Sequence, residues 1–181
     1  MLSGGSQQLA DDHSALNEIL VQLQGTLNGD DIAAIHSHLD LFWARLAVHI
    51  RAEHLHLFPS LISRLSEKTA YPSLAPNLRE AQLAVEQLRS DHEFFMHELG
   101  RAIQTVRDLS QPADAIRKPI LEIEKRLVVH NDREENQIYR WATTVLNEEE
   151  QADLAMRINR ELTNLPPRFR GQSGDDTRLK K

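Results

Sequence analysis

Apolar residues recur every three or four positions along most of this chain, a spacing typical of helices that bury one face. We predict four long helices and a shorter fifth, because runs of β-branched residues are few. The predicted ranges are about 7–27, 32–66, 77–109 and 110–146, with the fifth helix beginning past residue 147. The pattern indicates an all-α protein: an antiparallel up-down-up-down four-helix bundle with a short fifth C-terminal helix.

Glycine, aspartate and proline mark the predicted breaks in these helices. Gly29, Asp30 and Asp31 form the first turn, where an aspartate can cap the second helix. Pro59 has no backbone N–H, so we expect it to kink or interrupt the second helix. Pro119 leaves the start of the fourth helix open.

Polar residues occupy positions on the predicted core stripes where a bundle usually has leucine. The row of buried positions on the second predicted helix continues onto His49 and Glu53. The row on the fourth predicted helix continues onto His130 and Glu134, and in each case the two residues are one helical turn apart. The first and third stripes each carry one histidine. The six candidate metal ligands are His13, His49, Glu53, His92, His130 and Glu134.

One buried His–Glu pair is explained as well by a hydrogen bond within an ordinary core. Here, however, the two halves of the chain repeat one arrangement: a histidine on one helix, then His-x-x-x-Glu on the next. The two histidines are 36 positions apart in the first half and 38 in the second. This repetition favours metal binding, because a cation offsets the cost of burying carboxylates.

Bundle geometry tests whether the six residues can meet. The histidines lie at similar distances from the turns that join their helices, so all four are expected at one level. Because the second and fourth helices run in the same direction, Glu53 and Glu134 are expected one turn beyond that level, approaching each other. Four imidazoles and two carboxylates suit two iron ions, each bound by two histidines and bridged by both glutamates.

Such a pair of ions would keep open coordination positions. We expect a pocket walled by Phe42, Leu46, Phe95, Leu127 and similar residues, suited to dioxygen, peroxide or nitric oxide. Ferritin-like di-iron bundles use a Glu-x-x-His spacing, which differs from the one here. His-Glu-x-x-His is absent from the sequence, so zinc-protease chemistry has no support.

With these spacings, the chain resembles the hemerythrin-like (HHE cation-binding) domain over about residues 7–146. The matching positions are His13, His49-x-x-x-Glu53 with the trailing Leu57-Phe58-Pro59, His92, and His130-x-x-x-Glu134. The resemblance implies a non-haem di-iron centre, oxo- or hydroxo-bridged when oxidised, in a four-helix bundle. Members of this family are linked to oxygen binding, to oxygen, iron or nitric-oxide sensing, and to peroxide decomposition.

The sequence departs from the oxygen-carrying hemerythrins at one position. Those proteins have a further histidine one turn after the third-helix histidine, where this chain has Met96, and His97 is off the stripe by one position. The pattern is similar to bacterial hemerythrin-like proteins and iron-sensing relatives. One imidazole fewer leaves one iron less saturated, which favours ligand exchange or redox turnover over reversible carriage.

Several other histidines and aromatic residues are expected to have lesser roles. His54 and His56 lie two positions apart and point to different sides of a helix, so they form no shared chelate, although His56 is a candidate to support a ligand. Tyr139 could contact a bound oxygen species, but we expect an ordinary half-buried tyrosine. Surface or boundary positions are expected for His36, His38 and His97, and packing roles for Trp43 and Trp141.

Composition and charge narrow the possible chemistries and partners of the protein. The chain has 181 residues, no cysteine and a net charge of −6, which excludes thiolate chemistry and disfavours nucleic acid as a partner. We expect residues 1–163 to form the bundle with its capping helix and residues 164–181 a flexible tail. Neither a signal peptide nor a membrane span is recognised, so we expect a cytoplasmic protein without a membrane partner.

Two hypotheses follow. The first is a di-iron protein that binds or turns over oxygen-derived small molecules, with catalase-like peroxide decomposition the favoured activity. The second is an oxygen-, iron- or nitric-oxide-sensing module without turnover, whose fifth helix or basic tail reports the state of the iron site to a partner.

Overall fold

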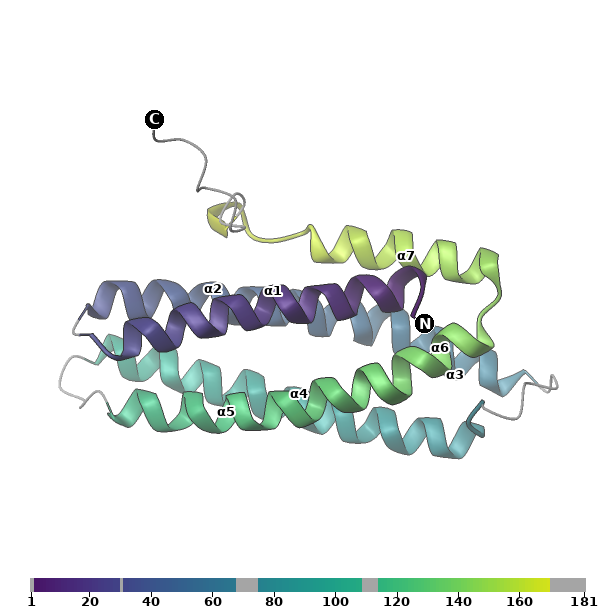
Figure 1. The fold of residues 1–181 in the computed structure, drawn as a ribbon, viewed down its shortest axis with the longest axis horizontal. Coiled ribbons are helices and arrows are strands. Elements are labelled where there is room, and N and C mark those ends of the chain that lie inside the picture. The colour runs from purple at the N-terminus through teal and green to yellow at the C-terminus, as the bar shows by residue number, and fades with distance from the viewer. Residues whose placement is uncertain (1, 30, 68–74, 109–113, 170–181) are drawn as a thin grey trace.

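The computed structural model describes residues 2–29, 31–67, 75–108 and 114–169, and Figure 1 shows long helices lying side by side. Its elements are α1 (Gly4–Leu27), α2 (Ile32–Ala52), the π-helix η1 (Glu53–Leu57), α3 (Phe58–Ser66), α4 (Leu78–Arg107), α5 (Asp114–Arg133), the π-helix η2 (Glu134–Ile138), α6 (Tyr139–Val145), α7 (Glu148–Leu162) and the 3₁₀ turn η3 (Pro167–Phe169).

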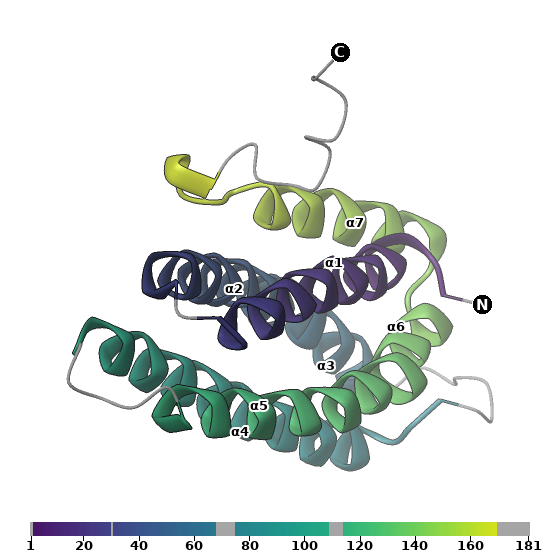
Figure 2. The ribbon, with the colours of Figure 1, turned by 60° about the vertical axis from the view of Figure 1, so that its left-hand side comes forward.

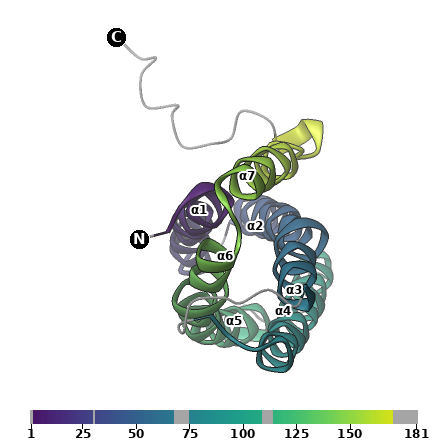
Figure 3. The same cartoon turned by 90° about the vertical axis from the view of Figure 1, so that its right-hand side faces the viewer.

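The long helices form an up-down-up-down bundle. Figures 1 and 2 show α1 beside α2 and α4 beside α5, with consecutive helices running in opposite directions. Viewed from the end in Figure 3, α7 lies outside the bundle, against α1 and α2. The predicted all-α bundle with a fifth helix is confirmed. Within the described part of the chain, no helix combines the length and apolar composition that a bilayer-spanning segment requires.

The second and fourth long helices are each interrupted by one turn of π-helix. In η1 the Phe58 N–H donates to the Glu53 carbonyl, and in η2 the Tyr139 N–H donates to the Glu134 carbonyl, five residues back in each case. The sequence predicted an interruption near Pro59, but the change begins earlier, at Glu53. The matching interruption at Glu134 was not predicted, because no proline marks it.

The core consists of two apolar clusters on either side of the predicted ligand positions. One cluster includes Leu20, Phe42, Phe95 and Ile123, and the other includes Leu9, Phe58, Leu88 and Ile138. Most apolar residues that recur every three or four positions along the helices are buried; Ile32 at the start of α2, 39% exposed, is an exception. The predicted ligand positions therefore interrupt an otherwise apolar bundle.

The chain after α7 folds back onto α2. Leu165 and Phe169 are buried against Leu41, Ala44 and Val48, and the Arg168 guanidinium lies 3.0 Å from the Asp40 carboxylate. Residues 164–169 therefore pack on the bundle, although we expected the flexible tail to begin at residue 164. Residues 170–181 of that tail lie outside the described residues, and the domain boundary at 163 stays a prediction.

Side chains cap the starts of α2 and α7. Asp31, from the predicted turn, accepts a hydrogen bond from the Ala34 N–H at the start of α2. At the start of α7, the Asn147 side chain accepts from the Glu150 N–H, while the Glu150 carboxylate accepts from the Asn147 N–H. This reciprocal capping box satisfies two backbone donors of α7.

We expect Asn147→Ala to lower the free energy of unfolding by about 1 kcal/mol, because it leaves a backbone donor of α7 without its cap. Urea denaturation measures this change, and the same substitution at the exposed Asn164 is the matched control. Equal stability of the two variants would contradict a capping role for Asn147.

Candidate metal centre

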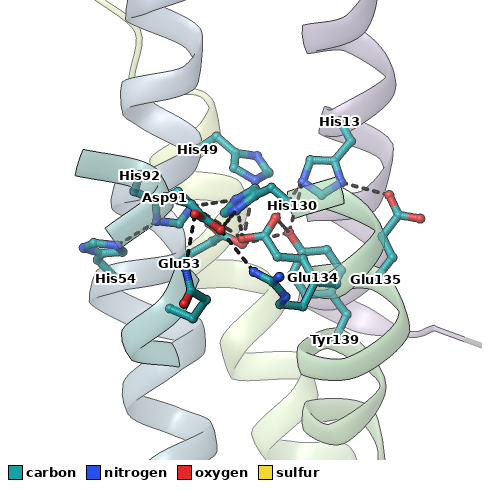
Figure 4. Close-up of polar contacts among 12 residues, drawn as sticks. His13, His49, Glu53, His54, Asp91, His92, His130, Glu134, Glu135 and Tyr139 are labelled. Carbon is teal, nitrogen blue, oxygen red and sulfur yellow. Dashed lines mark hydrogen bonds and ion pairs between the residues drawn. The ribbon is translucent and has the colours of Figure 1, made fainter. Parts of the chain in front are cut away.

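The six residues predicted as ligands meet in the middle of the bundle (Figure 4). His13 comes from α1, His49 from α2, His92 from α4 and His130 from the last turn of α5, which ends directly before Glu134. All six side chains are buried, and Glu53 and Glu134 are 0% exposed. Glu53 and Glu134 are the first residues of η1 and η2, so both π-turns begin at a predicted ligand.

The four imidazoles form two pairs. His13 and His49 have ring centroids 4.8 Å apart. His92 and His130 have centroids 4.6 Å apart and present their Nε2 atoms to each other at 2.9 Å. Each pair, together with Glu134, brings three donor atoms within 4.8 Å of one another, a spacing that can hold a metal ion. The site therefore has two adjacent cation-binding groups that share a carboxylate.

Glu134 turns one oxygen toward each histidine pair. Its Oε2 lies 3.1 Å from His13 Nε2, and its Oε1 lies 3.0 Å from His130 Nε2 and 3.4 Å from His92 Nε2. Glu53 is oriented similarly, with Oε2 at 3.3 Å from His92 Nε2 and Oε1 at 3.8 Å from His49 Nε2. Each carboxylate therefore directs one oxygen toward each histidine pair.

Tyr139 completes the inner cluster. Its side chain is fully buried, and its hydroxyl donates to Glu53 Oε1 at 2.8 Å and lies 3.3 Å from His13 Nε2. Burial and the two glutamates raise the pKa of Tyr139 well above its usual value of 10.0. Of the two interpretations considered from the sequence, the half-buried packing tyrosine is therefore wrong: the hydroxyl touches a predicted ligand.

Some polar atoms of the cluster have no hydrogen-bond partner within the described part of the chain. They include His49 Nε2, Glu53 Oε2 and Glu134 Oε1, which all face the interior of the cluster. Buried polar atoms without partners are costly. These atoms are nitrogen and carboxylate oxygen, which divalent iron, manganese and zinc accept, so the donor set fits a metal.

The two carboxylates have opposite protonation preferences when no cation separates them. Burial, and then the neighbouring Glu134 carboxylate, raise the pKa of Glu53 well above 4.5. Burial acts the same way on Glu134, but His130, His13 and His92 outweigh it and hold the pKa of Glu134 well below 4.5. Two adjacent carboxylates in a dry core do not both ionise readily, and a bound cation would remove that restriction.

Two histidines are oriented by aspartates that are in turn held by arginines. The His49 Nδ1–H donates to Asp12 Oδ2 at 3.0 Å, and Asp12 Oδ1 accepts from Arg45 at 2.7 Å. Burial disfavours the charge on Asp12, but the His49 hydrogen bond and the charges of His49 and Arg45 outweigh it and lower the pKa of Asp12. This support fixes Nδ1 as the protonated nitrogen, leaving Nε2 to face the cluster.

The second half repeats this support with one difference in geometry. His130 Nδ1 lies 3.4 Å from Asp91 Oδ2, and Arg133 donates to the same oxygen at 3.1 Å. Arg133 and His130 thus share one carboxylate oxygen, whereas Arg45 and His49 use separate oxygens of Asp12.

The remaining two histidines also have partners on Nδ1. His13 donates to Glu135 Oε1 at 2.8 Å, and His92 Nδ1 lies 2.9 Å from His54 Nε2. Burial, His92 and Arg89 lower the pKa of His54 to about 4. Every predicted histidine ligand is therefore hydrogen-bonded through Nδ1 and presents Nε2 to the cluster.

Sequence reasoning missed these outer partners. Asp12 and Asp91 each directly precede a predicted ligand, so the dipeptide Asp-His at 12–13 and 91–92 is the signal that could have found them. The residue that contacts a ligand is His54; His56, the candidate from the sequence, lies instead 3.9 Å from Glu161 of α7.

Met96 and the three remaining histidines lie outside the cluster of predicted ligands. His97 is 70% exposed, and His36 and His38 are partly buried at the boundary, as predicted. Met96 packs beside the first apolar cluster and contributes to its edge.

A cavity of about 90 Å³ adjoins the cluster. Its wall includes the predicted residues Phe42, Leu46 and Leu127, together with His13, His49, His92, His130 and Glu134. Phe95 does not line this cavity but packs edge-to-face on His130, with ring centroids 5.1 Å apart. An apolar space in direct contact with the predicted ligands suits a small molecule.

Fold and site together define a class: a helical bundle whose core holds a histidine–carboxylate metal-binding cluster. The family model described as the hemerythrin HHE cation-binding domain matches residues 4–142. This chain therefore belongs to the hemerythrin HHE cation-binding family. Neither a curated protein nor a solved structure shows significant similarity to it.

In metal-free protein at neutral pH, we expect Glu53→Gln to raise the free energy of unfolding by about 1–3 kcal/mol, because it removes a group whose charged form is disfavoured by burial and by Glu134. Urea denaturation after chelation measures this effect. Glu18→Gln, at an exposed position of α1, is the control. A destabilised metal-free Glu53→Gln would show that the carboxylate is already satisfied without a cation.

Proposed function

We propose that this protein is a non-haem di-iron protein whose ligands are His13, His49, Glu53, His92, His130 and Glu134. The observation that carries this proposal is the orientation of the two buried carboxylates, each with one oxygen toward each histidine pair. In the proposed centre the His13–His49 and His92–His130 pairs would each hold one iron, Glu53 and Glu134 would be shared by both, and an oxo or hydroxo group would join the oxidised ions.

The favoured activity is decomposition of hydrogen peroxide. Bound iron would supply the redox capacity and the open coordination positions for this chemistry. In the overall reaction one peroxide molecule is reduced to two water molecules and a second is oxidised to dioxygen, so the electrons balance without another reductant. Dioxygen and nitric oxide are further proposed ligands, because they too fit a small apolar space.

The chain's own residues contribute binding, orientation and a hydrogen-bond donor. Leu46 and Leu127 supply apolar wall to a cavity of about 90 Å³, a size that would admit only small molecules. Tyr139 holds a hydroxyl within reach of Glu53 and His13. That hydroxyl would keep Glu53 oriented and can donate to an oxygen-containing ligand beside it.

A contact between α7 and the π-turn supports the alternative of a sensor without turnover. Arg51, near the end of α2, donates to Glu161 of α7 at 2.6 Å, and His56 of η1 lies 3.9 Å from the same carboxylate. Because η1 begins with Glu53, a change at the centre would reach α7 through this contact. In this alternative, binding of dioxygen or nitric oxide at the centre would change the position of α7.

We expect protein loaded with ferrous iron to hold two iron ions per chain and, on oxidation, to show the optical bands of a bridged di-iron centre. It should consume peroxide with release of dioxygen. Glu53→Ala should slow this consumption by more than about 100-fold, because loss of a direct ligand exceeds the 10–100-fold effect typical of outer partners. Metal analysis, absorption spectra and an oxygen electrode measure these quantities.

Other outcomes would contradict this assignment. Tight, slow ligand binding that alters protection of α7 in hydrogen exchange, without turnover, would favour the sensor. Absence of stoichiometric metal would overturn both candidates.

The cavity gives a separate test of ligand access. Leu127→Trp is expected to fill it and to slow peroxide consumption by about 10-fold or more, while iron content stays at the wild-type level. Leu83→Trp, at a position 48% exposed on α4, is the matched control. If Leu127→Trp leaves the rate unchanged, the ligand does not use this cavity.

A further inference from the structure

The two histidine pairs of the centre differ in what holds them from outside. In the first pair, both imidazoles donate Nδ1–H to carboxylates: His13 to Glu135 at 2.8 Å and His49 to Asp12 at 3.0 Å. A carboxylate that accepts from Nδ1–H makes the opposite nitrogen a stronger metal ligand. Both Nε2 donors of this pair therefore receive anionic support.

The second pair receives weaker support. A His92 that binds metal through Nε2 keeps its proton on Nδ1, so the neighbouring His54 must accept that hydrogen bond and be neutral. His130 has a carboxylate partner, Asp91, but at the longer distance of 3.4 Å. One histidine of this pair therefore has a neutral acceptor and the other a stretched contact.

The arginines increase this difference. Arg45 binds Asp12 Oδ1 and leaves Oδ2 to His49, whereas Arg133 and His130 share Asp91 Oδ2, with the arginine at the shorter distance. Asp12 is also more buried than Asp91, at 8% against 19% exposed. Hydrogen bonds to charged groups are stronger where water is excluded, so Asp12 supports its histidine more strongly than Asp91 does.

We propose that the two metal positions are unequal, that the His13–His49 position binds metal more tightly, and that Asp12 is the positioning residue chiefly responsible. This inference rests on the proposed two-metal centre. It makes the His92–His130 position the one that loads last and releases its ion first.

Single-position variants separate the two halves. His130→Gln retains the first pair, and His13→Gln retains the second pair. Titration of each variant with Co²⁺ as the probe, followed by its visible absorption bands, gives one dissociation constant for each position. We expect the first position to bind Co²⁺ about 10-fold more tightly or better, given the 10–100-fold effects of outer partners.

Asp12→Asn is then combined with each variant. It should weaken Co²⁺ binding by about 10–100-fold when the first pair is retained, and change it less than about 3-fold when the second pair is retained. A merely structural effect would weaken both. Asp12→Glu keeps the carboxylate and should recover most of the affinity, and circular dichroism of each variant verifies the helical fold.

Asp40→Asn is the matched control, because Asp40 lies on α2 and pairs with an arginine, Arg168, away from the centre. It should leave both Co²⁺ constants unchanged. Equal affinities at the two positions, or an equal loss in both backgrounds on Asp12→Asn, would overturn the inference. Wild-type protein that binds no stoichiometric metal would instead overturn the proposed function, so the two failures are distinguishable.

Discussion

Two carboxylates lie close together in a core from which water is excluded, and the rest of the structure accommodates them. Glu53 and Glu134 would repel each other if both were charged and alone, since burial strengthens the interaction between like charges. Four imidazoles and the Tyr139 hydroxyl surround them, and the two apolar clusters adjoin this polar layer on either side. Removing a cation from such a layer leaves unpaired donors in the interior, so metal binding and fold stability are linked.

The two π-turns lie at the same two buried glutamates. Each begins at one of the glutamates, and after each turn two consecutive residues are buried, Leu57 with Phe58 and Ile138 with Tyr139. A π-turn places one more residue in the turn than an α-helix does, so it shifts the register of the residues that follow. Tyr139 directly follows η2, and its hydroxyl donates to Glu53, the first residue of η1. The local change in helix type therefore lies directly before a second polar group of the centre.

Much of this could be predicted from periodicity, because helical spacing fixes which face of a helix is buried. His49 and Glu53 lie on the same helix face as Leu46. Because both halves of the chain carry one histidine followed by His-x-x-x-Glu, the sequence predicts that the histidines of all four helices meet at one level. The outer partners could not be derived in this way. Asp12 and Asp91 lie one position off the stripe, where an acidic residue is usually solvated, and only the packing of the neighbouring helix turns each toward an imidazole. The second π-turn was likewise missed, because hydrogen-bond shifts within a helix leave no residue-type signal as strong as proline.

The repeated code of the two halves also hides a difference that bears on chemistry. Both halves carry the same predicted ligands, a histidine and then His-x-x-x-Glu. However, His13 Nδ1 is hydrogen-bonded to the Glu135 carboxylate, whereas His92 Nδ1 is hydrogen-bonded to the imidazole of His54. A metal pair with unequal donors has one ion held firmly and another whose ligands are weaker and whose charge is less neutralised. That second ion would attract an incoming ligand more strongly, since less electron density reaches it from the protein. The two halves of the sequence repeat the same predicted ligands, but the residues hydrogen-bonded to those ligands differ. These outer residues lie outside the repeated motif, and they would make the two metal positions unequal.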